Sequence, residues 1–113
     1  MNVLETKEDL QVALAESYDS RVLIFKISNV CPTSEALYAE LKKITSENTA
    51  IAKRINLLVV QDARELSNLI EMKFGIVHET PQVLIVENED VIYYESHEYI
   101  DLKKVMELLS ARG

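Results

Sequence analysis

Three short runs of almost uninterrupted apolar residues constrain the fold of this chain most strongly. They span residues 21–27, 55–60 and 82–87, and β-branched side chains are common in them. Such composition is typical of strands. A strand without polar alternation is buried on both faces, so it belongs inside a sheet that helices cover on either side. The runs therefore predict an α/β protein.

Apolar residues at helical spacing occupy the segments between and around these runs. Helices are predicted over about residues 7–17, from Pro32 to about Ser46, from a cap at Asp62 to a left-handed terminating residue at Gly75, and after a cap at Asp101. A strand, a helix and a second strand in succession form a right-handed crossover with a parallel strand pair. Helices and strands thus alternate along most of the chain.

The last two predicted strands, residues 82–87 and 91–95, are separated by the short polar segment 88–90. This spacing predicts an antiparallel hairpin. Together with the parallel pair it gives a mixed, four-stranded sheet with helices on both faces. No repeat, linker or low-complexity tract interrupts the pattern, so residues 1–113 are predicted to form a single domain.

The overall charge and composition exclude several classes of protein. The net charge of −7 argues against a nucleic-acid-binding surface, which requires clustered Lys and Arg. No apolar run is long enough to cross a membrane, and the residues from Met1 onward lack the features of a signal peptide. A single cysteine allows no internal disulfide, which fits a reducing compartment. We therefore expect a cytoplasmic protein that binds neither nucleic acid nor membrane.

Cys31 lies between the first apolar run and the second predicted helix. Pro32 suits the first helical position, because its ring fixes φ and its missing N–H would have no intrahelical acceptor. Cys31 is therefore predicted at a helix N-terminus, where Pro32, Thr33 and Ser34 shape a site that favours the thiolate. The alternative is that Cys31 is a small, buried apolar residue.

The topology places Cys31 where α/β proteins bind their ligands. In open sheets the ligand lies beyond the carboxyl ends of the parallel strands, and the loop with Cys31 follows the first of these. A cysteine at this position, combined with Pro81 just before the third central strand, is the pattern of the thioredoxin fold. We therefore predict a thioredoxin-like fold.

Three stretches, residues 28–34, 77–82 and 95–101, carry a closer resemblance within that fold. They resemble the monothiol bacilliredoxins, which usually have Thr-Cys-Pro-Ile-Ser, Ser-Pro-Gln and Ser-His-Trp at these places. Four residues depart from the family pattern: Val30, Thr33, Thr80 and Glu98. These departures are mild, and none removes the cysteine.

The resemblance implies a thiol–disulfide oxidoreductase that removes bacillithiol, a small thiol of some Gram-positive bacteria, from mixed disulfides on client proteins. Cys31 would attack the bacillithiol sulfur, release the client thiol and carry the bacillithiol. Ser34 stands where dithiol relatives have a resolving cysteine, so the thiol that resets Cys31 must come from another molecule. Bacillithiol is thus a co-substrate, and no bound cofactor is expected.

The resemblance also implies that the Thr80–Pro81 peptide bond is cis and faces the cysteine, with the backbone of Thr80 pairing with an extended substrate. Composition alone would favour a trans bond. Ser96 and His97 follow the fourth predicted strand on the side that should face Cys31, which indicates substrate binding. A surface histidine near a helix start is the alternative for His97.

Other polar residues carry weaker signals. The spacing of the two histidines, His78 and His97, fits no zinc pattern, so no metal site is predicted. Lys26, near the end of the first strand, could support a thiolate or a substrate carboxylate, although the solvated end of a strand is the simpler interpretation.

Two alternative functions remain open at the level of sequence. One is a glutaredoxin-like protein that binds glutathione and an iron–sulfur cluster, although its Cys-Gly-Phe-Ser motif and glycine pair are absent. The other is a thioredoxin-fold module with an inert cysteine and a groove at Pro81 that docks an extended peptide. The pH dependence of Cys31 alkylation separates the enzyme from the binding module.

Overall fold

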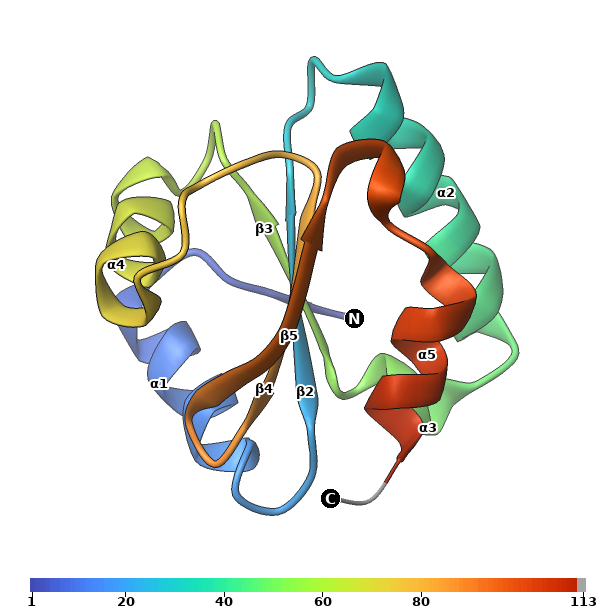
Figure 1. Cartoon of the computed structure of the whole chain (residues 1–113), viewed down its shortest axis with the longest axis horizontal. Coiled ribbons are helices and arrows are strands. Elements are labelled where there is room, and N and C mark those ends of the chain that lie inside the picture. Colours follow the sequence, from blue (N-terminus) through green and yellow to red (C-terminus); the bar gives the residue numbers. More distant parts are fainter. Residues whose placement is uncertain (112–113) are drawn as a thin grey trace.

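The computed structural model describes residues 1–111 and contains one mixed sheet between two layers of helices (Figure 1). The strands are Asn2–Val3 (β1), Val22–Ile27 (β2), Ile55–Val59 (β3), Gln82–Glu87 (β4) and Asp90–Ser96 (β5). The helices are Lys7–Glu16 (α1), Pro32–Ser46 (α2), Thr49–Ala52 (α3), Arg64–Phe74 (α4) and Leu102–Ser110 (α5), with a 3-10 turn at His97–Tyr99 (η1). The predicted α/β class and thioredoxin-like order of elements are confirmed.

The strand order across the sheet is β1-β3-β2-β4-β5. β1 and β2 both pair with β3 in parallel, and β4 pairs antiparallel with β2 and β5. The helices α1 and α4 cover one face, and α2, α3 and α5 cover the other (Figure 1). Each face carries its own apolar core, and the side chains of β2 alternate between the two cores. This double coverage explains why β2 contains so few polar residues.

The sheet has five strands rather than the predicted four, because β1 adds a short parallel edge. Two residues are too few for a periodic pattern, and both side chains of β1 are exposed. The next residue, Leu4, holds this strand in place. Leu4 is buried and donates a backbone hydrogen bond to Leu57 at 2.8 Å. Tertiary packing of Leu4 therefore sets this edge.

Two helix starts also differ from the prediction. Asp62 was expected to cap α4, but its backbone N–H closes a turn onto Val59 at 3.0 Å, and Ala63 takes the capping position without a side-chain bond. The short helix α3, which falls outside the predicted helices, begins at Thr49, and the side chain of its N-cap residue Asn48 accepts a hydrogen bond from the N–H of Ile51. Gly75 ends α4 with φ of 67°, as predicted.

A row of three polar side chains crosses the sheet near the carboxyl ends of β2 and β5. Lys26 on β2 pairs with Gln82 on β4, and Gln82 pairs with Ser96 on β5. Directly paired residues project from the same face, so these side chains are neighbours on the face that α1 and α4 cover. Lys26, Gln82 and Ser96 are all buried.

Candidate functional site

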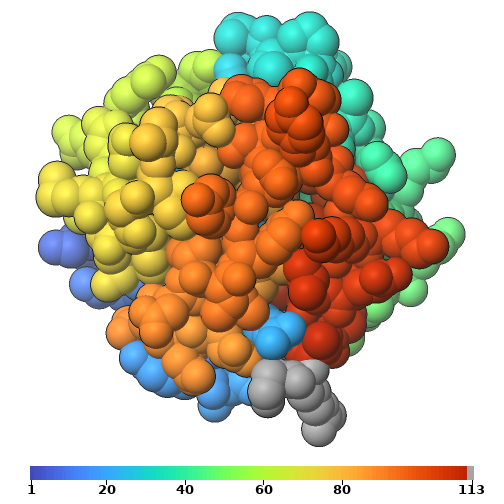
Figure 2. All heavy atoms as spheres, viewed as in Figure 1, coloured from blue at the N-terminus to red at the C-terminus, as the bar shows by residue number. Residues whose placement is uncertain are grey.

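Three segments that are distant in sequence meet at one end of the sheet. They are the loop between β2 and α2 with Cys31, the segment 76–81 before β4, and residues 96–100 after β5 (Figure 1). In Figure 2, cyan atoms of the first segment adjoin orange-red atoms of the third, with golden atoms of the second beside them. This end contains all of the residues for which a site role was predicted.

Cys31 occupies the N-cap position of α2, with extended backbone angles, and Pro32 is the first helical residue. Its side chain is partly exposed. Backbone and hydroxyl hydrogen bonds from Ser34, and then from Thr33, lower the pKa of the Cys31 thiol. Cys31 thus lies at the predicted helix N-terminus. A partly exposed thiol with a lowered pKa differs from the alternative of a small, buried apolar residue.

The loop that presents Cys31 is fixed from two sides. Ser34 is fully buried, and its Oγ accepts a hydrogen bond from the N–H of Ser28 at 3.2 Å. Gln61, just after β3, donates from Nε2 to the Ser28 hydroxyl at 2.7 Å and accepts from the N–H of Asn29 at 3.1 Å. Sequence reasoning missed Gln61. Its position directly after the second parallel strand, at the functional edge, was the available signal.

The Thr80–Pro81 peptide bond is cis, as the resemblance implies. The carbonyl of Pro81 accepts a hydrogen bond from the N–H of His97 at 2.9 Å. This bond joins the segment before β4 to the turn after β5. Ser96 ends β5 and is buried, whereas His97 begins η1 in a left-handed conformation with φ of 56°. The four residues predicted to bind substrate, Thr80, Pro81, Ser96 and His97, are therefore brought together by this bond, and we call this group the wall.

Glu79 joins this wall, although sequence reasoning did not select it. Its Oε1 lies 3.3 Å from Nε2 of His97, and the two side chains are 44% and 45% exposed. A hydrogen bond from Ser96 and another from His97 lower the pKa of the Glu79 carboxyl. An ionised carboxylate thus contacts the imidazole beside Pro81, a pairing of residues 18 positions apart that no local pattern indicates.

Lys26 is not the solvated end of a strand, as the simpler interpretation held. It is fully buried on the face that α1 and α4 cover, and burial lowers its pKa to about 8, partly offset by Glu71. Nδ1 of the nearby His78 forms a hydrogen bond of 2.9 Å with the Ser67 hydroxyl. Burial lowers the pKa of His78, and the positive charge of Lys26 lowers it further. Lys26 is buried because it lies on β2, a strand that helices cover on both faces.

Neither a metal cluster nor a membrane span is found in the part of the chain that the structure describes. Within residues 1–111, no three His, Cys, Asp or Glu side chains are grouped so that they could hold a metal ion. None of the helices in this range is both long and apolar enough to cross a bilayer.

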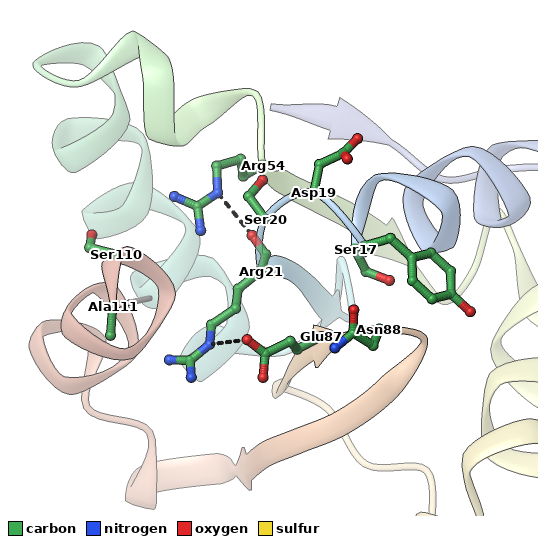
Figure 3. Close-up of a pocket in the computed structure, with 10 residues that line it drawn as sticks. Ser17, Asp19, Ser20, Arg21, Arg54, Glu87, Asn88, Ser110 and Ala111 are labelled. Atoms are coloured by element: carbon green, nitrogen blue, oxygen red, sulfur yellow. Dashed lines mark hydrogen bonds and ion pairs between the residues drawn. The ribbon is translucent and has the colours of Figure 1, made fainter. Parts of the chain in front are cut away.

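A pocket of about 620 Å³ lies at the other end of the sheet, beside the start of β2 (Figure 3). Arg21 contacts Glu87 at 3.3 Å and donates to the carbonyl of Leu108, while Arg54 donates to the carbonyls of Arg21 and Leu109. The guanidinium groups thus bind carbonyls at the C-terminal end of α5, where a helix favours cations. The contacts indicate a structural role for this pocket.

A sequence model of the monothiol bacilliredoxin BrxC family matches residues 2–105. The chain belongs to this family. The match covers the Cys31 loop and both other segments of the site. Family membership identifies the protein as a thiol oxidoreductase with thiol-based redox partners. Cys31 is the single cysteine of this bacilliredoxin family member and so supplies its thiol.

Solved structures similar to this bacilliredoxin family member share the thioredoxin fold. A protein assigned as an oxidoreductase with a thioredoxin fold is 24% identical, with a TM-score of 0.80 over 94% of this chain and 90% of its own. Thioredoxin from Fasciola hepatica is 14% identical, with a TM-score of 0.76 over 97% of both chains. Thioredoxin f2 from Chlamydomonas reinhardtii is 19% identical, with a TM-score of 0.69 over 96% and 92%.

Proposed function

We propose that this protein removes bacillithiol from mixed disulfides on client proteins by monothiol exchange at Cys31. The Cys31 thiolate attacks the bacillithiol sulfur, the bond between the two sulfurs of the mixed disulfide breaks, and the client leaves as a thiolate that takes a proton from water. A second thiol from another molecule then releases the bacillithiol from Cys31. Each step exchanges one disulfide for another, so external reductant is needed only to reset the cycle.

The observation that carries this proposal is the combination of Cys31 and Ser34 on the first turn of α2. Cys31 is partly exposed, and hydrogen bonds lower its pKa. Ser34 is buried beneath it and supplies two of those hydrogen bonds. A hydroxyl at this position supports the thiolate but cannot form a disulfide with it. The resulting chemistry is intermolecular.

We assign substrate binding to the wall formed by Thr80, Pro81, Ser96 and His97. An extended client segment would pair with the backbone of Thr80, while Ser96 and His97 border the small thiol. A reducing compartment such as the cytoplasm suits the cycle, because thiols that reset Cys31 are available there.

The test uses the purified reduced protein and a client that carries bacillithiol on one cysteine. Mass spectrometry should show release of the free client and gain of one bacillithiol on Cys31. Cys31→Ala should release no client. Activity that survives in Cys31→Ala, or a disulfide between Cys31 and the client in place of the bacillithiol adduct, would contradict the mechanism.

A further inference from the structure

The buried amide of Gln82 connects two segments of the candidate site. Its Nε2 donates to the carbonyl of Val77 at 3.0 Å and to the Ser96 hydroxyl at 3.2 Å. Val77 belongs to the segment that leads to Thr80 and Pro81, and Ser96 ends β5 next to His97. Gln82 itself is only 1% exposed. One side chain beneath the surface therefore holds both halves of the proposed substrate wall.

The orientation of this amide is determined by its partners. A backbone carbonyl can only accept hydrogen bonds, so the NH₂ group, and not the oxygen, must face Val77. Oε1 consequently points elsewhere and has no hydrogen-bond partner among the described residues. Nζ of Lys26, on the directly paired residue of β2, has none either. A buried polar atom without a partner destabilises the fold.

An apolar side chain of similar length would avoid this cost and fill the same space. Gln82 supplies what such a side chain lacks, a forked donor that reaches two separate chain segments. Buried polar groups that do not maximise stability are common where a site must be held in position. The bonds of Gln82 end on the two segments that flank Pro81, not on the apolar core.

We propose that Gln82 is a positioning residue for exchange: its amide holds the segment before Pro81 and the end of β5 in the relative position that receives the polypeptide portion of the mixed disulfide. This inference rests on the proposed function, because it assigns client binding to the same wall. Gln82 does not contact Cys31 in the hydrogen-bond network, so it acts on client binding and leaves thiolate chemistry unchanged.

The experiment compares two disulfide substrates with reduced protein. One is a peptide that carries bacillithiol in a mixed disulfide, and the other is 2-hydroxyethyl disulfide, which has no polypeptide portion. Gln82→Met should lower the second-order rate constant for the peptide about tenfold, the effect expected from losing two hydrogen bonds. The rate constant for 2-hydroxyethyl disulfide should change less than about twofold.

Two further variants make the comparison selective. Gln82→Glu keeps the size of the side chain and gains Lys26 as a counter-charge, but it loses the donor to Val77, so it should show the same selective loss for the peptide. Lys26→Met alters the same buried row but removes no hydrogen bond to either segment, so both rate constants should match those of the wild type. Gln82→Glu also preserves the test if Gln82→Met does not fold.

Equal losses with both substrates would show a purely structural role and overturn the inference, as would a wild-type rate with the peptide in Gln82→Glu. The same peptide is also loaded with glutathione. If the wild type reacts with the glutathione form but not with the bacillithiol form, the proposed function fails, while the effect of Gln82 on peptide binding is still measured.

Discussion

The acidity of the single thiol comes from neighbouring hydrogen-bond donors. Ser34 contributes through its backbone and hydroxyl, and Thr33 contributes in the same way. These donors are available because Pro32 begins the helix and leaves the N–H groups of the first turn without intrahelical acceptors. Reactivity at this residue is thus a property of the helix start.

Removing the Ser34 hydroxyl should raise the pKa of Cys31. In Ser34→Ala the backbone donors stay, so the thiolate loses only part of its stabilisation. The midpoint of the alkylation rate against pH should move upward and the rate at pH 7 should fall. Ser46→Ala, on the exposed last turn of α2, is the control. An unchanged midpoint in Ser34→Ala would refute this account of the thiolate.

Burial of Lys26 should make stability depend on pH above neutrality. The pKa of Lys26 is about 8 in the folded protein, and the reference value of 10.5 applies to the unfolded chain. Between pH 8 and 10.5 the unfolded chain therefore binds more protons than the folded protein. The free energy of unfolding should therefore rise as pH increases from 8 to 10.5.

Lys26→Met should abolish that rise and stabilise the protein at pH 7 by about 1–2 kcal/mol, because it removes a buried charge and its desolvation penalty. Urea unfolding across this pH range measures both effects, with the exposed Lys7→Met as the control. A wild-type pH slope in Lys26→Met would contradict the assignment.

At the scale of elements, the Cys31 loop depends on a residue from a different strand connection. Gln61 follows β3 and bonds to Ser28 and Asn29 through both atoms of its amide. β2 and β3 are parallel neighbours, so their carboxyl ends lie side by side and this reach is short. The loop therefore derives its shape from the sheet as well as from α2.

Gln61→Ala should loosen the loop without unfolding the domain. Because Asn29 loses the acceptor of its N–H, hydrogen exchange at this amide should become faster, whereas exchange in β2 should stay unchanged. Gln61→Glu retains acceptors for the Asn29 N–H and the Ser28 hydroxyl, so it should restore protection. Equal exchange at Asn29 in wild type and Gln61→Ala would show that the bond is not formed in solution.

At the scale of the whole molecule, the two ends of the sheet have different tasks. The upper end in Figure 1 carries the loop between β2 and α2, which contains the thiol, and the proposed substrate wall. The lower end holds α5 through Arg21 and Arg54 (Figure 3). Burial and the nearby Arg21 lower the pKa of Arg54, which shows that two cations converge there. Each of them donates to a carbonyl of α5, so this end stabilises the fold.

Arg54→Met should destabilise the protein by about 1–3 kcal/mol, because the carbonyls of Arg21 and Leu109 lose their charged donor. Thermal unfolding measures this loss, and Lys53→Met, an exposed neighbour, should have little effect. The alkylation midpoint of Cys31 should not move in Arg54→Met, since the two sites lie at opposite ends of β2. A shifted midpoint would show coupling between the two ends.

Much of this protein could be predicted from local sequence. Apolar runs predicted β2, β3 and β4. Apolar residues at helical spacing, with Pro32 and Gly75, predicted α1, α2, α4, α5 and the position of Cys31. These features depend on neighbours within a few residues, and burial on both faces leaves a clear pattern. The order of elements then placed Cys31 and Pro81 at the same edge.

Only the tertiary structure decided which polar side chains meet. β1 is too short to have a pattern and is placed by the burial of Leu4. Lys26 resembles a solvated strand end until strand pairing encloses it beside Gln82. Gln61 and Glu79 make their contacts across loops, and the reach of a polar side chain depends on three-dimensional distance, not on sequence spacing. The thiol was therefore predictable from the sequence, whereas the contacts that hold its surroundings in place were not.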